Sequence, residues 1–366
     1  MNLKQAKYKD FALVREMLET PEIIERFDFD QSRELSDALS RTANKRLLLT
    51  GEGSSRIFPA KNLIYRARCM GSHWHIFTEG ARQAHEYIGE AGHSFLADCL
   101  VIGASNSGKT KEVISLFTEL QKRQHPHRYG LTATPQSALE PLCTRCFLLS
   151  CGKENAVAAT KSVVEQALFY SSILRHVEEA VDVMATNQQR AARAAREVLE
   201  AELDPEIIGW IAAAPVVYFA GRNNGVAEEL TLKTNEITRK KSDYLEGTYA
   251  VHGIEEVMEP DEVVIAIDPF PEEMEKFRDV LVGGVGLKVI AVSSRPTIFP
   301  TIPIPEIEGY ETILQLLAGW NILVHVGVTL GINLDKAQRA RKIGNEFVGQ
   351  GQSGPMASGS QGRSHG

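Results

Sequence analysis

The sequence predicts an α/β protein built from two doubly wound parallel sheets that are joined by helices. Short runs rich in Val, Ile, Leu and Ala alternate with stretches whose apolar residues recur at helical spacing. This alternation is typical of parallel sheets covered on both faces. The runs form two series, separated by a long helical stretch. A length of 366 residues corresponds to about two domains, which fits two such sheets.

The first series predicts four strands, at 46–50, 99–103, 129–132 and 146–150. Apolar residues at i, i+3 and i+4 spacing predict helices between these strands, over 54–69 and 110–123. Residues 1–44 are helical in pattern and contain no glycine, so we expect them to pack on the first half. Residues 155–202, rich in Ala, Glu and Gln, predict long helices that connect the two halves.

The second series predicts strands at 215–220, 262–267 and 288–293, in the same order as their counterparts. The repeat suggests a duplication, although regular strand spacing in any α/β protein would give a similar pattern. Residues 349–366 are Gly/Ser-rich and bury too little apolar surface to offset their ordering entropy, so we expect a disordered tail. The expected organisation is a helical segment (1–44), a first domain (45–200), a second domain (201–348) and the tail.

Composition and charge argue against several classes of function. The 40 Lys and Arg against 47 Asp and Glu give a net charge of −7, whereas nucleic-acid binders concentrate positive charge, so no nucleic-acid partner is expected. No signal peptide is visible, and the apolar stretch 314–332 is interrupted by Gln315, Asn321 and His325, which indicates a buried helix and no membrane role. We expect a cytoplasmic protein whose five scattered cysteines are reduced thiols.

The most informative segment is 100–110 (LVIGASNSGKT), where an apolar strand runs into small polar residues and then into a helix. The first N–H groups and the positive dipole end of a helix attract anions. Gly108 allows the backbone to approach closely, and Ser105, Ser107 and Thr110 add hydroxyl donors. The segment therefore predicts a phosphate site.

Two other interpretations of this loop stay open. Residues 103–110 satisfy the G-x-x-x-x-G-K-[ST] pattern of nucleotide-binding P-loops, which predicts an NTPase that holds Mg-nucleotide at Lys109 and Thr110. The Ser and Asn residues are also ordinary helix caps. In the second half the corresponding stretch, 268–273, is acidic and constrained by proline, so a phosphate is expected in the first half only.

Four segments carry a resemblance to a known family: the loop 105–110, the turn 52–55, the stretch 156–161 (AVAATK) and the segment 221–252. Together they resemble the double SIS (sugar isomerase) family, and more narrowly the isomerase half of glucosamine-6-phosphate synthase. Stand-alone phosphosugar isomerases, amino-sugar-phosphate deaminases and fructosamine-phosphate deglycases share this resemblance. It covers residues 45–345 and implies two SIS-type, flavodoxin-like halves. The synthase's glutaminase half has no counterpart here, so glutamine-driven amination is not expected.

The resemblance implies a binding site for a sugar phosphate. In the family, the S-x-S-G-x-T loop holds the phosphate, which implicates Ser105, Asn106, Ser107 and Thr110, with Ser54 of the first turn near the sugar. Lys109 departs from the family pattern, because the synthase carries an acidic residue there, and it receives no role.

The resemblance also implicates four residues in catalysis. The family's Lys-x-x-Glu-Ile helix matches Lys233 and Glu236, its Lys-His-Gly turn matches His252, and the lysine of its C-terminal loop matches Lys342. Aldose–ketose interconversion needs a group that moves a proton between C1 and C2, for which Glu236 is the candidate. Lys233, three residues earlier, shares its helix face; a surface ion pair is the alternative for the two. His252 suits ring opening, and Lys342 suits Schiff-base formation or oxyanion stabilisation, or it belongs to a cationic helix end.

The function implied is a phosphosugar isomerase or isomerising deaminase that acts on a hexose 6-phosphate, with an amino sugar favoured. A fructosamine-phosphate deglycase and a non-catalytic sugar-phosphate-binding protein are the alternatives. The family's shared site implies a homodimer or larger homo-oligomer in which His252 serves the neighbouring subunit. No metal or other cofactor is expected. Val251 and Tyr249 replace the synthase's Lys and Glu, so the synthase's own substrate is not carried over.

Overall fold

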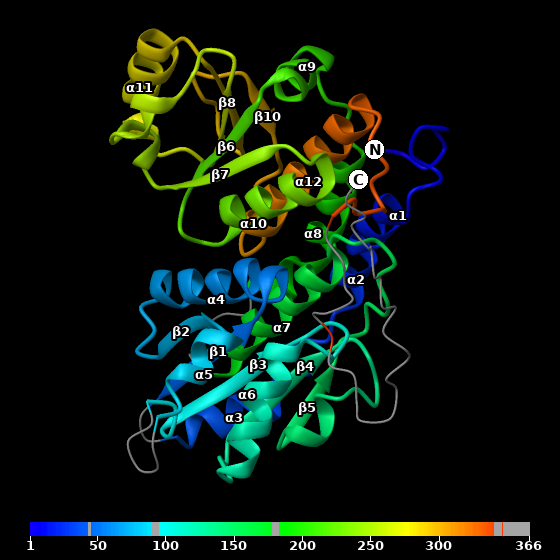
Figure 1. The fold of residues 1–366 in the computed structure, drawn as a ribbon, viewed down its shortest axis with the longest axis vertical. Helices are drawn as coiled ribbons and strands as arrows, with labels where there is room; N and C mark the ends of the chain where they lie inside the picture. Colours follow the sequence, from blue (N-terminus) through cyan, green and yellow to red (C-terminus); the bar gives the residue numbers. More distant parts are fainter. Residues whose placement is uncertain (43–44, 90–94, 178–182, 340–345, 347–366) are drawn as a thin grey trace, which may run out of the picture.

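The computed structural model describes residues 1–42, 45–89, 95–177, 183–339 and 346, and within them it has two parallel sheets of five strands each (Figure 1). The first sheet consists of β1 (Arg46–Gly51), β2 (His75–Gly80), β3 (Cys99–Ala104), β4 (Arg128–Thr132) and β5 (Arg145–Leu148). The second consists of β6 (Val216–Gly221), β7 (Lys241–Glu246), β8 (Val263–Ile267), β9 (Lys288–Ser293) and β10 (Thr301–Pro303). The predicted α/β class with two doubly wound sheets is confirmed.

Both sheets have the same topology. The strand orders are β2-β1-β3-β4-β5 and β7-β6-β8-β9-β10, and every pair of neighbours is parallel. In each sheet the second strand along the chain lies on one side of the first strand, and the remaining three strands follow one another on its other side. The order therefore reverses between β1 and β3, and again between β6 and β8. Such a switch point leaves a crevice at the carboxyl ends of the strands, where ligands bind in open α/β sheets.

The helices fill in the layers around the sheets. They are α1 (Ala12–Leu18), α2 (Thr20–Arg26), α3 (Arg33–Ser40), α4 (Ile57–Cys69), α5 (Ala81–Glu86), α6 (Lys111–Lys122), α7 (Lys161–Val177), α8 (Val183–Glu200), α9 (Pro205–Ala213), α10 (Val226–Lys233), α11 (Met274–Phe277) and α12 (Glu311–Thr329). The N-terminal helices α2 and α3 pack on α7, and α2 also packs on the connecting helix α8.

Alternating side chains on the strands bury both faces of each sheet. In β1, Leu47 and Leu49 belong to a core shared with α4 and α7, whereas Leu48 faces the opposite cluster with α5 and α6. In β6, Val217 and Phe219 join the same shared core, and Tyr218 joins a smaller cluster with α11. One continuous core therefore crosses the boundary between the two halves and holds their inner faces together.

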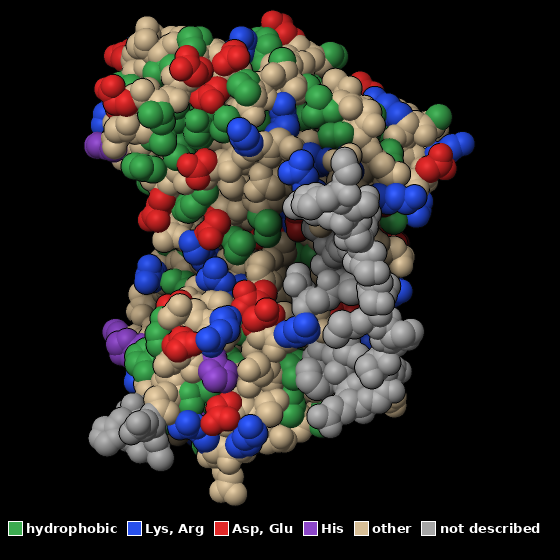
Figure 2. Space-filling model, viewed as in Figure 1, with side chains coloured by type: hydrophobic (Ala, Val, Ile, Leu, Met, Phe, Trp, Pro, Cys, Tyr) green, Lys and Arg blue, Asp and Glu red, His purple; other side chains and the backbone are tan. Residues whose placement is uncertain are grey.

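The boundary itself is formed by α4 of the first half and α10 of the second, which lie side by side in Figure 1. Gly225 precedes α10 with φ +88°, and a Cβ there would lie 2.8 Å from the Cα of Phe58 at the start of α4. Because this approach leaves no room for a side chain, glycine is needed at this contact. On the face shown in Figure 2, acidic and basic side chains are interspersed over both halves.

The apolar stretch near the C-terminus forms the buried helix α12, as predicted. Among the helices that the structure describes, α12 is the one long and apolar enough to cross a membrane, and 83% of that stretch is buried inside the fold. His325 within it donates a hydrogen bond from Nδ1 to the carbonyl oxygen of Asn321 at 2.8 Å. Burial lowers the pKa of this histidine, so it is a neutral, hydrogen-bonded packing residue.

Candidate functional site

The candidate site lies at the switch point of the first sheet. The turn after β1 carries Ser54, and the loop after β3 carries Ser105 to Thr110. The two segments are in close contact, because a Cβ on Gly51 would lie 3.0 Å from the carbonyl oxygen of Ala104. Parallel pairing of β1 with β3 brings both carboxyl ends to the same edge of the sheet. The sequence motif and the topology thus point to one place.

The loop after β3 is held in one conformation by its own hydrogen bonds. The N–H of Gly108 donates to the carbonyl oxygen of Ser105 at 2.9 Å, with Gly108 at φ +62°. A Cβ on Gly108 would lie 2.3 Å from the side chain of Ser137, so both the backbone conformation and the packing require glycine here. The N–H of Lys109 donates to the hydroxyl of Ser107 at 3.3 Å.

The helix that follows this loop begins without a side-chain cap. Thr110 is the N-cap residue of α6, but its Oγ1 lies 2.7 Å from the Oγ of Ser105 instead of bonding to the first turn of the helix. The N–H of Thr110 itself donates to the same Ser105 oxygen at 3.3 Å. No side chain among the described residues caps the first N–H groups of this twelve-residue helix, and two hydroxyls lie beside them, which is an arrangement that suits an anion.

Glu154 is a residue of the candidate site that the sequence did not predict. This buried carboxylate accepts hydrogen bonds from the N–H and the hydroxyl of Thr160, at 2.7 and 3.1 Å, and from the side chain of Ser162. It also accepts from the Nδ2 of Asn106 at 2.9 Å, which fixes the amide of a predicted phosphate-binding residue. Its position shortly after β5, at the same edge as the loop, is the signal that could have identified it.

Lys233 connects the two halves at this site. Its fully buried Nζ donates to the Oγ of Ser54 at 2.7 Å and to the Oε2 of Glu236 at 2.7 Å. It also lies 3.4 Å from the Oε1 of Glu229. Burial opposes the charge of Lys233, but the carboxylates of Glu236 and Glu229 outweigh that cost, and its pKa is raised. The surface ion pair considered for Lys233 and Glu236 is therefore wrong for the lysine, which has no exposed surface.

Glu229 was also missed by the sequence analysis. It lies one helical turn before Lys233 on α10 and is completely buried. Burial raises its pKa, and the neighbouring lysine partly opposes that shift. Both carboxylate oxygens lack a hydrogen-bond partner among the described residues, so the ion pair with Lys233 is what compensates this group.

Glu236 presents its carboxylate at the edge of the site. It lies in a π-helical turn, η3 (Thr234–Thr238), that continues α10, and its side chain is 28% exposed. π-helical turns occur frequently at functional sites. The carboxylate is thus held on one side by Lys233 and remains open to a ligand on the other.

The chain returns to this site near its C-terminal end. Asp335 accepts hydrogen bonds from the N–H groups of Ala12 and Leu13, both at 2.8 Å, and so caps α1. Glu346 forms an isolated antiparallel bridge with Thr110 of the predicted phosphate-binding loop, residues 105–110, which is called the phosphate loop below. Lys342, the predicted lysine of this segment, lies outside the described residues.

His252 is not brought to the other site residues within one chain. It is exposed in the turn after β7, and its Nε2 lies 3.3 Å from the Nζ of Lys276. No hydrogen bond or ion pair joins this described histidine to Lys233 or Glu236.

The loop lacks the features that would favour a nucleotide-binding P-loop. Gly103 lies inside β3, and a Cβ there would be 2.3 Å from the ring of Phe117, so packing accounts for this glycine. Lys109 is exposed, and Thr110 is engaged with Ser105. The geometry therefore supports a compact anion site in place of a wrapped polyphosphate.

Known proteins resemble this chain in sequence, although no family model matches it. A Legionella pneumophila protein described as an isomerizing glutamine–fructose-6-phosphate aminotransferase is 25% identical over 347 residues, which cover 86% of this chain and 56% of that protein. A Halobacterium salinarum protein of the same description is 26% identical over 181 residues, which cover 46% and 30%. The chain thus spans about half, or less, of the length of the curated relatives it matches.

Solved structures share the fold over nearly the whole chain. The C-terminal domain of glucosamine-fructose-6-phosphate aminotransferase from Francisella tularensis has a TM-score of 0.73 and 18% identity, and covers 90% of this chain and 98% of its own. Tagatose-6-phosphate ketose/aldose isomerase from Escherichia coli gives 0.72 and 17%, with 92% and 99% covered. Glucosamine-6-phosphate deaminase from Thermotoga maritima gives 0.65 and 17%, with 90% and 98% covered. The chain therefore has the two-sheet fold of these solved structures, and its sequence resembles isomerizing glutamine–fructose-6-phosphate aminotransferases.

Proposed function

We propose that this protein is a phosphosugar isomerase that moves a proton between C1 and C2 of a hexose 6-phosphate. The observation that carries the proposal is the buried Lys233, which joins Ser54 beside the phosphate loop to the carboxylate of Glu236. An anion site and a candidate base are thereby held at one switch point. The names of the relatives, an aminotransferase, a ketose/aldose isomerase and a deaminase of phosphosugars, support the same substrate class.

In the proposed reaction, the start of α6 and the hydroxyls of Ser105 and Thr110 bind the phosphate and so fix the sugar relative to Glu236. The Glu236 carboxylate takes the proton from the carbon next to the carbonyl group, and an enediol forms, or an enolamine when the substrate carries an amine. A proton passes from the hydroxyl oxygen on one carbon to the former carbonyl oxygen on the other, and the same Glu236 carboxyl returns the carbon-bound proton to the neighbouring carbon. Geometry of this kind is the first requirement for a general base.

Lys233 has a positioning role in this scheme. It donates hydrogen bonds to Ser54 and Glu236 and forms an ion pair with Glu229, and its raised pKa keeps it charged at neutral pH. It therefore orients the base and the first turn, and it is not itself a base. Asn106 and Ser107 complete the phosphate loop, with Asn106 oriented by Glu154.

Two further residues are part of the proposal. Lys342 reaches the substrate from the C-terminal segment, for which the bridge between Thr110 and Glu346 is the support. His252 opens the sugar ring in the site of a neighbouring subunit of a homodimer or larger homo-oligomer, for which its exposed position is the support. An amino-sugar substrate, with deamination or deglycation as the outcome, is a finer form of the same proposal.

The experiment follows solvent hydrogen exchange, which does not require the product to be known. Glucose 6-phosphate, fructose 6-phosphate, glucosamine 6-phosphate and fructosamine 6-phosphate are each incubated with the protein in D2O, and deuterium at C1 and C2 is followed by NMR. We expect exchange with at least one of them. Glu236→Gln should slow it by about 10²–10⁴-fold, the usual contribution of a general base.

The matched control is Glu272→Gln, an exposed glutamate of the second half that should leave exchange unchanged. Binding of all four compounds is measured in parallel by thermal shift, together with Mg-ATP. Binding without any exchange would show a non-catalytic sugar-phosphate-binding protein. Stabilisation by Mg-ATP alone would overturn the proposal in favour of a nucleotide site.

A further inference from the structure

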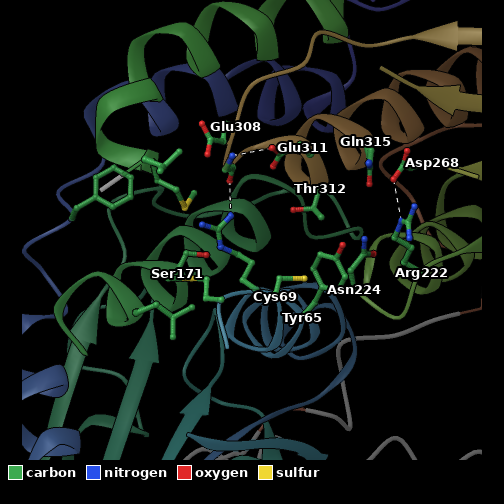
Figure 3. Close-up of a pocket in the computed structure, with 17 residues that line it drawn as sticks. Tyr65, Cys69, Ser171, Arg222, Asn224, Asp268, Glu308, Glu311, Thr312 and Gln315 are labelled. Atoms are coloured by element: carbon green, nitrogen blue, oxygen red, sulfur yellow. Dashed lines mark hydrogen bonds and ion pairs between the residues drawn. The ribbon is translucent and has the colours of Figure 1, made fainter. Parts of the chain in front are cut away.

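A second cavity, of about 620 Å³, lies between the two halves and away from the phosphate loop (Figure 3). It is lined from the first half by α4, with Tyr65, Arg66 and Cys69, and from the second half by the start of α12, with Thr312 and Gln315. In Figure 3 the labelled side chains of α12 face Cys69 and Tyr65 across the open space. A cavity of this volume is in the range of small-molecule sites.

This cavity lies at the switch point of the second sheet. The turn after β6 contributes Arg222 and Asn224, and the residue that follows β8 is Asp268. These positions correspond to Glu52 and Ser54 after β1 and to Ser105 after β3. Helix α4 closes the cavity from the other half, as α10 closes the first site. The same topological rule that places a ligand at the first site therefore applies here.

The chemistry of this switch point is unsuited to a phosphate. Asp268 stands where the first half has Ser105, and its carboxylate is held by the Nε of Arg222 at 3.0 Å and the Nη2 of Arg295 at 2.5 Å. The helical segment that follows, α11 continued by the π-helix Arg278–Val285, is preceded by this carboxylate and begins beside the acidic Glu272 and Glu273. The arginines at this loop are thus engaged by protein carboxylate, and the acidic side chains at the start of the helical segment disfavour an anion.

Two buried polar atoms of the lining are without partners. The Oε1 of Gln315 has no hydrogen-bond partner among the described residues, and the side chain is only 6% exposed. The Nε of Arg66 is also buried without a partner, although its Nη1 donates to the carbonyl oxygen of Gly309 at 2.7 Å. An unsatisfied buried donor and acceptor each carry a desolvation cost that a ligand would relieve. Both side chains line the cavity, so a ligand that both donates and accepts hydrogen bonds can reach this pair once either side chain shifts.

We propose that this cavity binds a small polyhydroxylated ligand that carries no phosphate, a free sugar or amino sugar. Sugar hydroxyls donate and accept together, and they match the acceptor of Gln315 and the donor of Arg66. Glu308 and Glu311 also line the cavity and provide carboxylates for an amino group. The site is independent of the phosphosugar site, so either proposal can fail without the other.

The test uses Cys69, whose exposed thiol lines the cavity, as a reporter. The protein is alkylated with iodoacetamide in the presence of D-glucosamine, D-glucose or inorganic phosphate, and the rate at Cys69 is followed by mass spectrometry. The peptide with Cys143 and Cys146, remote from the cavity, is the internal reference. We expect at least one sugar at millimolar concentration to slow Cys69 alkylation several-fold, and phosphate to leave it unchanged.

Two variants assign the effect to this cavity. Gln315→Leu replaces an unpartnered polar group with an apolar one of similar size, so it should fold and lose the protection, whereas the exposed Gln121→Leu should keep it. Ser105→Ala with Thr110→Ala disables the first site and should also keep it. The proposal is overturned if neither sugar protects Cys69, if phosphate protects equally, if Gln315→Leu retains protection, or if the double variant abolishes it.

Discussion

The switch points of the two sheets have the same strand order but different polar side chains. In the first, the loop after β3 offers hydroxyls and the start of a twelve-residue helix, and a buried lysine arrives from the other half. In the second, the loop after β8 offers a carboxylate paired with two arginines. The strand order creates a crevice in both places, and only the side chains decide which ligand each crevice can accept.

The largest expected effect concerns the buried lysine of the first switch point, which is compared with a second Lys–Glu pair at the contact between α4 and α10. Lys233→Met leaves Glu229 fully buried without its cation, so we expect the free energy of unfolding to fall by about 3–5 kcal/mol. Adding Glu229→Gln should recover much of this loss. Lys61→Met is the control, because Lys61 and its partner Glu228, between α4 and α10, both keep about a fifth of their side-chain surface in contact with water, so it should cost less than Lys233→Met. Urea unfolding compares the three variants with the natural sequence, and equal losses for both lysines would contradict the argument.

A glycine of the phosphate loop tests whether its shape is required by packing. Gly108→Ala places a Cβ 2.3 Å from Ser137 in a left-handed conformation, whereas Gly247→Ala at φ +59° meets nothing within 4 Å. Both variants carry the same backbone strain, so their difference isolates the clash. We expect Gly108→Ala to be less stable than Gly247→Ala by about 2 kcal/mol, as for overpacked sites. Thermal unfolding that shows no difference would mean that the loop adjusts freely.

The hydroxyls of the first switch point should contribute to affinity and not to turnover. Ser105→Ala removes the oxygen that bonds Thr110, and we expect it to weaken phosphosugar binding by about 1.5 kcal/mol, roughly tenfold in Kd. Thr118→Ala, on the same helix but bonded to the backbone of Ile114, is the control and should leave Kd unchanged. Isothermal titration calorimetry compares them. An unchanged Kd in Ser105→Ala would remove this loop from the binding site.

The smallest expected effect is on the pH dependence of stability, and it concerns Glu16, which contacts the backbone next to Glu154. Glu16 of α1 accepts hydrogen bonds from the backbone of Asn155 and Ala156, and burial raises its pKa despite those bonds. A raised pKa means that the folded state binds the proton more tightly, so stability from Glu16 is lost as pH rises from the ordinary value near 4.5 through the folded pKa. The free energy of unfolding of Glu16→Gln, compared with that of the natural sequence, should therefore rise by less than about 1 kcal/mol over that pH interval. Unfolding curves at pH 4.5 and 7 measure it, and a gap that moves the other way would contradict the sign.

Sequence patterns predicted the central strands well and the edge strands poorly. The strands β1, β3, β6 and β8 are buried on both faces and appear as continuous apolar runs. The missed strands β2, β7 and β10 lie at sheet edges, where few residues are fully buried and the apolar pattern is weak. These segments are strands because they form hydrogen bonds with a neighbouring strand, and no local sequence pattern encodes that pairing.

The candidate site shows the same division between local and distant information. The phosphate loop is one contiguous motif, and the sequence therefore predicted Ser105, Asn106, Ser107 and Thr110 together at one switch point. Glu154 and Glu229 were missed, because an isolated glutamate carries no local signal of burial or of its partner. The predicted roles of His252 and Lys342 stay predictions, since each depends on a neighbour or a segment outside the described chain.

The hydrogen bond from Lys233 to Ser54 joins residues that are 179 positions apart. A contact between residues so distant in sequence is expected to form late in folding, because the entropic cost of closing the long intervening chain precedes the stabilisation from the contact. The phosphate loop, by contrast, closes over five residues between Ser105 and Thr110. During synthesis and folding the loop can thus take its shape before Glu236 is held in place, and the proposed proton transfer requires that the second half has docked.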